Sequence, residues 1–197
     1  AMTPELALKH GVECIYQEFN LIDVLSAAEN ICYGRKLGHL VNQKKMRKIA
    51  QDLFDDFGVD INPDTPVRDL TPGHMQIVEI AKAVSRNARV LILDEPTAPL
   101  SVAEVEILFR IVRKLKADGV AIIFISHRLA STRFCDTILF LENGKIKERG
   151  THDELLGSSD IYREVYYSQN SQAAKESGYN IRGGTVDGAV AGEGGNA

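Results

Sequence analysis

The chain has 197 residues, of which 44% are hydrophobic and 25% are charged, and its formal net charge at pH 7 is −4. This composition provides enough apolar side chains for one domain with a core, and it excludes a chain that is disordered throughout. The slightly acidic balance argues against the broad basic surface that nucleic acids require, so we expect no nucleic-acid partner. The three cysteines lack metal-site spacing, which indicates reduced thiols in a cytosolic protein.

The first predicted strand covers residues 12–16 and ends at Gln17. The stretch that follows, approximately residues 21–86, shows helical patterns only, with one apolar stripe that Gly58 terminates. A further helix in this stretch begins at Thr71, whose hydroxyl can cap it. We therefore predict an α-helical subdomain that is inserted between two strands of a sheet.

Strands and helices alternate in the second half of the chain, which is typical of a parallel sheet with covering helices. Continuous apolar runs predict strands over residues 90–93, 120–125 and 137–141. Ser101 and Glu104 form a capping box at the start of the helix between the first two of these strands. These patterns favour an α/β fold class.

The end of the chain is predicted as one helix and a tail. Thr151 and Glu154 form a second capping box, which predicts a C-terminal helix. From Ser168 onward the sequence is rich in Gly, Ser and Ala, which predicts a flexible tail over residues 168–197. The N-terminal residues lack a basic segment followed by an apolar one, and the longest apolar run is too short to cross a bilayer. A membrane role would therefore come through a partner.

Two adjacent carboxylates, Asp94 and Glu95, directly follow the apolar run at residues 90–93. Like charges side by side cost free energy unless a cation or a reaction uses them. An apolar strand that ends in Asp-Glu is typical of a Walker B motif, in which the Asp holds Mg²⁺ and the Glu polarises the attacking water. Alone, such a pair is more often a solvated strand end. Its order along the chain with Gln17 and His127 makes the pattern more specific.

These segments, in this order, resemble the nucleotide-binding domain of an ATP-binding cassette (ABC) transporter over about residues 8–167. The resemblance implies a truncated P-loop NTPase core with a mainly parallel sheet and an α-helical subdomain, so that residues 1–167 are an incomplete ABC ATPase domain. It implies ATP and Mg²⁺ as cofactors. In "IYQEFNL", Gln17 would contact Mg²⁺ and the attacking water and sense the membrane subunit. Asp94 would bind Mg²⁺, Glu95 would be the catalytic base and His127 would contact the γ-phosphate.

By the same resemblance, "LTPGHMQ" is the signature segment, which binds the γ-phosphate of ATP held by the opposite subunit. Free amides at a helix N-terminus attract anions, and this property suits that role. His74 departs from the usual glutamine, and Ser101 stands where the D-loop segment "APLS" usually has aspartate. The cofactor-binding residues that the resemblance implies are Leu70, Thr71, Pro72, Gly73, His74 and Ser101.

The phosphate-binding motif G-x-x-x-x-G-K-[ST] of the family does not occur in the chain, because the one Gly-Lys pair, Gly144-Lys145, follows Asn143 in a predicted hairpin turn. In related ATPases the strand of that motif lies between those that match residues 120–125 and 137–141. These two strand edges would then pair with each other, recruit another chain or cause aggregation. We therefore hypothesise that the chain alone neither binds ATP tightly nor hydrolyses it, which leaves open whether it is an enzyme.

Two subfamily resemblances occur in the one chain. Residues 8–129 look like a monosaccharide-importer ATPase, whereas residues 127–167 look like the ATPase end of an ABC exporter. The larger match favours a partial ATP-binding subunit for monosaccharide import at the inner face of the plasma membrane. Its partners would be transmembrane permease subunits, a second ABC ATPase domain and, indirectly, a sugar-binding protein. The alternatives are a catalytically inactive ABC-derived interaction module and an exporter ATPase.

Overall fold

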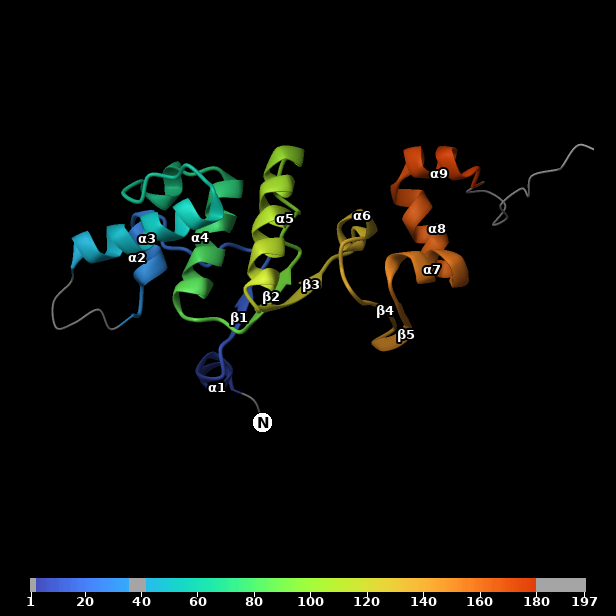
Figure 1. Ribbon diagram of the computed structural model, residues 1–197, viewed down its shortest axis with the longest axis horizontal. Coiled ribbons are helices and arrows are strands. Elements are labelled where there is room, and N and C mark those ends of the chain that lie inside the picture. Colours follow the sequence, from blue (N-terminus) through green and yellow to red (C-terminus); the bar gives the residue numbers. More distant parts are fainter. Residues whose placement is uncertain (1–2, 36–41, 180–197) are drawn as a thin grey trace, which may run out of the picture. The chain divides into compact units, whose positions relative to one another are not determined.

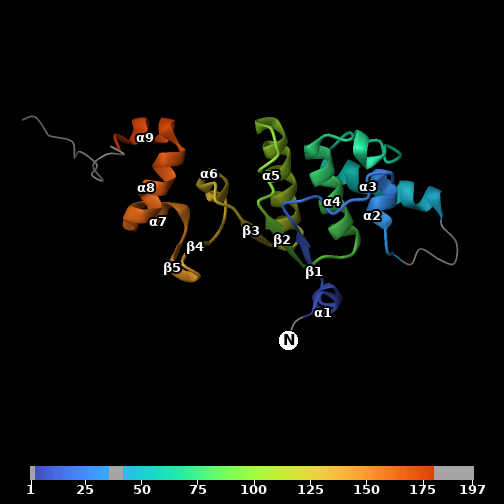
Figure 2. The ribbon, with the colours of Figure 1, turned by 180° about the vertical axis from the view of Figure 1, so that it is seen from behind.

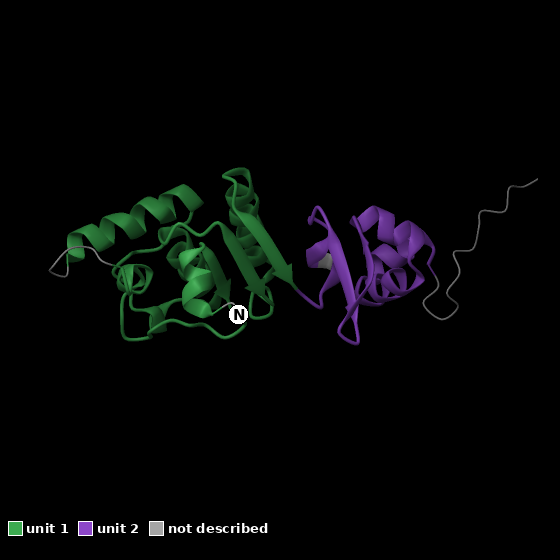
Figure 3. Ribbon diagram, turned by 90° about the horizontal axis from the view of Figure 1, so that it is seen from below, with its two compact units in different colours: residues 1–125 green, residues 126–197 purple. Residues whose placement is uncertain are grey.

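The computed structural model describes residues 3–35 and 42–179, and it divides the chain into two compact units. Unit 1 covers Ala1–Ile125 and unit 2 covers Ser126–Ala197 (Figure 3). Each unit has a hydrophobic core of its own. The division lies between residues 125 and 126, whereas the sequence predicted one domain up to residue 167. The buried apolar side chains of the two units form separate clusters, which is consistent with this division.

A three-stranded parallel sheet forms the centre of unit 1, in the order β1-β2-β3 (Figures 1 and 2). Its strands are β1 (Val12–Ile15), β2 (Val90–Asp94) and β3 (Ala121–Ile125). In the register, Ile15 lies opposite Leu93, and Asp94 lies opposite Ile125. The predicted parallel sheet is confirmed for these strands. Because parallel strands end at the same edge, the residues that follow β1 and β2 are brought close together.

One face of this sheet packs against helices. On that face, the ring of Phe109 in α5 (Val102–Ala117) stacks on Phe124 of β3, with 5.6 Å between the ring centroids. The opposite face of β3 is open, because Ile123 is 50% exposed and Ile125 is 47% exposed. The predicted capping box between Ser101 and Glu104 is present at the start of α5. The fully buried side chains of unit 1 include Ile31, Phe54, Val67, Val78, Ile80, Leu91, Leu93, Leu108 and Ile111.

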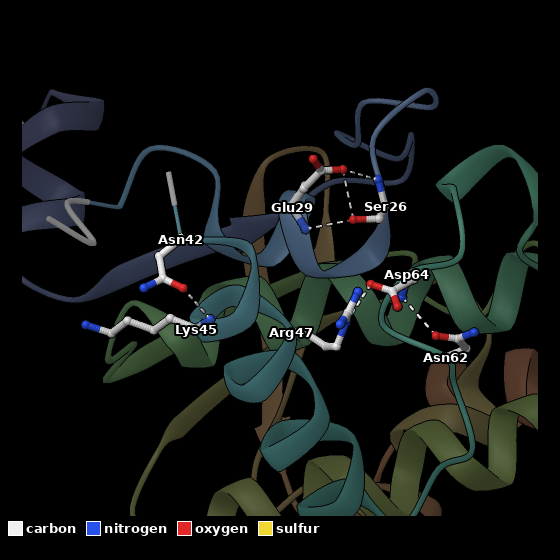
Figure 4. Close-up of polar contacts among 7 residues, drawn as sticks. All are labelled: Ser26, Glu29, Asn42, Lys45, Arg47, Asn62 and Asp64. Atoms are coloured by element: carbon white, nitrogen blue, oxygen red, sulfur yellow. Dashed lines mark hydrogen bonds and ion pairs between the residues drawn. The ribbon is translucent and has the colours of Figure 1, made fainter. Parts of the chain in front are cut away.

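Between β1 and β2, the described chain forms helices, as the sequence predicted. They are α2 (Ala27–Cys32), α3 (Gln43–Phe57), the 3-10 helix η1 (Val67–Asp69) and α4 (Pro72–Ser85). Figure 4 shows how polar side chains fix their ends, with a capping box of Ser26 and Glu29 that the sequence reading missed. Figure 4 also shows Arg47 of α3 beside Asp64, and its Nε lies 2.9 Å from Oδ1 of that residue.

A short helix not predicted from the sequence, α1 (Pro4–Lys9), precedes β1.

Unit 2 begins with α6 (Leu129–Thr132) and an antiparallel hairpin of β4 (Ile138–Glu142) and β5 (Lys145–Gly150). Asn143 and Gly144 have φ values of 52° and 73°, as a tight hairpin turn requires. The predicted hairpin at Gly144-Lys145 is thus confirmed, but the prediction that residues 137–141 belong to the parallel sheet is wrong. β4 pairs with β5, whose charged sequence gave no apolar strand signal.

The helices α7 (His152–Ser158), α8 (Asp160–Gln169) and α9 (Ser171–Ser177) complete the described part of unit 2. Tyr162 is fully buried, and its hydroxyl lies 2.9 Å from Nδ1 of His152. The predicted capping box of Thr151 and Glu154 is present.

The predicted flexible tail is wrong over residues 168–179. α8 continues to Gln169, and the helix α9 follows it. The ring of Tyr179 stacks on Tyr167 with 4.5 Å between centroids, so aromatic contacts hold this segment against α8. The remainder of the predicted tail, residues 180–197, lies outside the described residues.

Candidate functional site

The residues that follow β1 and β2 lie at one edge of the sheet of unit 1. Asp94 is the last residue of β2, and Gln17 follows the end of β1 at Ile15, which is paired with Leu93. Asp94 is half-buried and Gln17 is exposed. The structure therefore brings these two predicted magnesium ligands to the same edge, with oxygen atoms as the available donors.

Glu95 has a left-handed backbone, with a φ of 47°. Its N–H donates to the carbonyl oxygen of Ile125 at 3.0 Å, and its carbonyl accepts from Ala98 at 3.1 Å. A non-glycine residue in this conformation costs about 1–3 kcal/mol, and such residues cluster at functional sites. The strained turn after β2 is consistent with a functional carboxylate, although no motif in the sequence predicts its φ.

The segment after Gln17 is fixed to α4 by two side chains that sequence reasoning missed. The backbone N–H of Asn20 donates to the Glu79 carboxylate at 2.9 Å, and Lys82 donates to the Asn20 carbonyl at 2.9 Å. Burial raises the pKa of the Glu79 carboxyl and lowers the pKa of the Lys82 amine. The signal available in the sequence was an acid and a base three residues apart on one helix, which is too common to assign.

Asn30 holds the next part of the same loop. Its side chain is 1% exposed, and its Oδ1 accepts from the N–H of Ile22 at 2.8 Å. Its Nδ2 donates to the carbonyl oxygens of Ile22, Leu25 and Ser26. A buried amide with these partners fixes the path of the chain between the sheet and α2.

The signature segment forms the N-terminus of α4. Thr71 is the N-cap, its Oγ1 accepts from the N–H of His74 at 3.2 Å, and Pro72 occupies the first turn. Gly73 is buried, His74 is half-buried, and Leu70 precedes the cap. The predicted helix start at Thr71 is therefore confirmed.

Glu104 joins the signature segment to the start of α5. Its Oε1 accepts from Oγ1 of Thr71 at 3.0 Å and from the N–H of Gly73 at 3.1 Å. Its Oε2 accepts from the N–H and the hydroxyl of Ser101 at 2.9 and 2.8 Å. Hydrogen bonds from Ser101, and then from Thr71 and Gly73, hold the pKa of Glu104 below its ordinary value. Sequence reasoning identified Glu104 as a cap of its own helix and missed its reach to α4.

An open pocket of about 540 Å³ lies where the predicted segments meet. Gln17 contributes from the loop after β1, Met75 from α4, and Ala98 and Pro99 from the loop after β2. The structure thus brings together the loops that carry Gln17, the signature segment and Ser101. The complete lining is Gln17, Glu18, Phe19, Asp23, Val67, Met75, Ala98 and Pro99.

His127 belongs to unit 2, where it is exposed. Its carbonyl oxygen accepts from Nε2 of Gln169 at 2.9 Å, which ties the residue to the end of α8. Its predicted place beside Asp94 and Glu95 stays a prediction.

The residues present fit Mg²⁺ but not a complete ATP site. Within residues 3–35 and 42–179, no group of three or more His, Cys, Asp or Glu side chains could hold a metal by itself. Mg²⁺ typically uses one or two carboxylates together with phosphate oxygens, and Asp94 with Gln17 suits that donor set. The 197 residues contain no G-x-x-x-x-G-K-[ST] segment to surround the phosphates.

Among the described helices, none has the length and apolar character needed to cross a bilayer.

Comparison with protein families matches residues 3–98 to the family described as ABC transporter. The chain is 50% identical over 139 residues to the ribose import ATP-binding protein RbsA 1 of Streptomyces avermitilis, covering 68% of this chain and 26% of that protein. It is 46% identical over 144 residues to the ribose import ATP-binding protein RbsA of Hahella chejuensis, covering 71% and 29% respectively. It is 42% identical over 143 residues to the arabinose import ATP-binding protein AraG of Yersinia pestis, covering 71% of this chain and 27% of that protein.

Solved structures show the same fold. A dimeric ATP-binding cassette in a post-hydrolysis state bound to ADP and Pi superposes with a TM-score of 0.65 at 24% identity, covering 77% of this chain and 68% of that chain. A bacterial ABC exporter with ATP bound superposes with a TM-score of 0.64 at 26% identity. The match covers 82% of this chain and 29% of the exporter chain. The predicted α/β fold is therefore confirmed. The chain spans between 26% and 29% of the length of these curated relatives.

Proposed function

The chain belongs to the ABC transporter ATPases, of which it holds part of one domain, and we propose on this premise that it supplies the magnesium-binding, water-activating and signature segments of a transport ATPase. The remaining part, a glycine-rich phosphate loop with its lysine, would come from residues outside these 197. ATP hydrolysis by the assembled site would drive the import of a monosaccharide.

The observation that carries this proposal is the parallel register of β1 and β2. It brings Gln17 and the Asp94-Glu95 pair to one edge of the sheet, next to the pocket that Met75 and Pro99 line. In open α/β sheets, ligands bind outside the carboxyl ends of the strands. A solvated strand end would need neither the left-handed turn at Glu95 nor the fixed loop after Gln17.

Each predicted residue has a role in this proposal. Asp94 and Gln17 would hold Mg²⁺ through oxygen atoms, and Glu95 would accept a proton from the attacking water. Bound Mg²⁺ would neutralise charge on the phosphate groups. His127 would contact the γ-phosphate. The signature residues Leu70, Thr71, Pro72, Gly73 and His74, together with Ser101, would face a nucleotide held by a second ABC ATPase domain.

The relatives support a proposal about the transported solute and the partners. The names of those relatives refer to import of ribose and arabinose, which supports a monosaccharide as the transported solute. The pocket has acidic side chains, Glu18 and Asp23, beside the apolar Phe19 and Met75. We propose that it receives a segment of a transmembrane permease subunit at the cytoplasmic face of the membrane. A sugar-binding protein would act on that permease, without contact to this chain.

Phosphate release from MgATP tests the proposal. The chain would be mixed with a polypeptide that carries the strand, phosphate loop and lysine of an ABC ATPase. We expect no turnover by the chain alone and measurable turnover in the mixture. Glu95→Gln should lower that turnover about 100-fold or more, because a general base contributes about that factor. Glu106→Gln, an exposed carboxylate on α5, is the matched control and should keep wild-type turnover. Turnover that survives Glu95→Gln would contradict the assigned role.

The inactive interaction module remains the second candidate, and the two departures from the pattern of the family, His74 and Ser101, favour it. A module of this kind would keep the pocket and bind a permease or a complete ATPase without turnover. In the mixing experiment it would form a complex with the added polypeptide and release no phosphate.

The exporter alternative has support in the match to a bacterial ABC exporter, which covers 82% of this chain. The predicted exporter-like residues 127–167 fall within unit 2, whereas the importer-like residues form unit 1 up to Ile125. Purified sugar-importer and exporter membrane subunits, offered in parallel, would distinguish the two. Binding of the exporter subunit alone would overturn the importer assignment.

A further inference from the structure

Glu104 uses its two carboxyl oxygens for two different helices. Oε2 accepts from the backbone N–H and the hydroxyl of Ser101, at the start of its own helix α5. Oε1 accepts from the Thr71 hydroxyl and the Gly73 N–H, at the start of α4. One charged side chain therefore connects the N-termini of both helices. Hydrogen bonds to a charged acceptor are about twice as strong as those between neutral groups.

The first turn of α4 has each of its N–H groups satisfied inside the chain. Pro72 has no N–H, and Gly73 donates to Glu104. His74 donates to Oγ1 of Thr71, and Met75 donates to the Thr71 carbonyl oxygen at 2.9 Å. An incoming phosphate group would therefore find the Gly73 N–H already bonded to a negatively charged side chain.

Gly73 makes the close approach of Glu104 possible. A Cβ atom at position 73 would lie 2.5 Å from Cδ and Cγ of Glu104, closer than real side chains come. The glycine thus permits a carboxylate to sit against the helix N-terminus. That place favours a single anion, because the helix dipole attracts negative charge whereas two anions there repel each other.

We infer that Glu104 is a positioning residue that locks the N-termini of α4 and α5 together, and that this lock must open before Gly73 can bind a phosphate group. The inference rests on the proposed function for the identity of the anion as a nucleotide phosphate. The lock itself is a property of this chain. Release of Glu104 would free the Thr71 hydroxyl and the Gly73 N–H together, and it would loosen their connection to Ser101.

Glu104→Gln tests the lock with little damage to α5. A glutamine at this position can still form a capping box with Ser101. Because its side chain has a single acceptor oxygen, it cannot accept hydrogen bonds from Ser101 and from Gly73 through two separate oxygens, as the carboxylate does. Glu106→Gln removes the same charge from the same helix at an exposed position and is the matched control. The measurement is the amide resonance of Gly73 in the full ¹⁵N-labelled chain, titrated with inorganic phosphate.

We expect the amide chemical shift of Gly73 to change in Glu104→Gln and to equal that of the wild type in Glu106→Gln. Inorganic phosphate should then perturb Gly73 at about tenfold lower concentration in Glu104→Gln than in the wild type, because a competing anion is gone. A purely structural brace would predict equal or weaker phosphate binding in the variant. That result, or an unmoved Gly73 resonance, would overturn the inference.

A pH titration of the wild-type chain keeps the inference testable if Glu104→Gln does not fold. The Gly73 resonance should follow protonation of Glu104 at a midpoint below the ordinary carboxyl value of 4.5. A Gly73 resonance that does not respond to acid would contradict the lock. Both experiments use this chain alone, so they stay informative if the mixture with a phosphate-loop polypeptide shows no turnover.

Discussion

Glu79 is a carboxylate on α4 that is only 5% exposed, yet it accepts the N–H of Asn20 and so holds the loop after Gln17. Burial raises its pKa above the ordinary value of 4.5, with the N–H of Asn20 and the charge of Lys82 opposing this shift. The folded chain therefore binds this proton more tightly than the unfolded chain does. The contribution of Glu79 to stability is full below pH 4.5 and is lost as the pH rises through the folded value.

Glu79→Gln should remove this pH dependence. The glutamine oxygen can still accept from Asn20, but it does not ionise. We expect the unfolding free energy of the wild type, relative to the variant, to fall as the pH rises from about 4 to 7. Urea unfolding across that range measures the difference, with the exposed Glu106→Gln as control. Parallel curves for the wild type and Glu79→Gln would show that burial does not perturb this carboxyl.

At the scale of elements, β3 is the exposed strand of unit 1. Its partner in the described sheet is β2, and no second described strand pairs with its other edge. Ile122 and Phe124 are half-buried on the side of α5, while Ile123 and Ile125 point away from that layer and are about half exposed. An apolar edge strand without charge or proline to protect it is prone to pair with other chains.

Ile123→Lys should therefore reduce self-association of the isolated chain. The lysine places a charge on the open face, where desolvation would cost free energy, so we expect association about tenfold weaker or more. Val102→Lys introduces the same charge at an 80% exposed apolar position on α5 and is the control. Sedimentation velocity over a concentration series measures the effect. Equal association of Ile123→Lys and the wild type would mean that β3 is not the contact.

Local signals predicted the strands β1, β2 and β3 and the capping boxes at Ser101 and Thr151, because each depends on a few neighbouring residues. The turn at Asn143-Gly144 predicted a hairpin, but four of the six residues of β5 (Lys145–Gly150) are charged, so it carried no apolar strand signal and its bounds and register depend on pairing with β4. α9 was also missed, because its place depends on the packing of Tyr179 against Tyr167.

The candidate site shows the same division. Gln17, Asp94 and Glu95 were predicted from their positions at strand ends. Glu104 and Glu79 were not, because their contacts join residues 31 and 59 positions apart in the chain. Contacts of this kind depend on how the helices pack, which motif spacing does not encode.

At the scale of the whole molecule, the two units have separate cores. Phe54 is fully buried in the core of unit 1, and Tyr162 is fully buried in that of unit 2. Large-to-small changes at such sites cost about 3–5 kcal/mol. The division after Ile125 therefore predicts that damage to one core leaves the other unit folded.

Hydrogen exchange measured by mass spectrometry tests this separation. Phe54→Ala should accelerate exchange throughout the helices of unit 1 and leave α7 and α8 protected as in the wild type. Tyr162→Ala should do the reverse. Loss of protection in both units from either change would show that the chain unfolds as one cooperative domain.

We propose that this chain holds the magnesium side of an ABC ATPase site, and its 197 residues contain no phosphate loop. Calorimetric titration with MgATP tests it most directly. We predict no micromolar binding by the chain alone, micromolar binding after addition of a polypeptide with the phosphate loop, and a clear loss of that affinity in Asp94→Asn. Micromolar MgATP binding by the isolated chain, or binding in the mixture that is indifferent to Asp94→Asn, would contradict the claim.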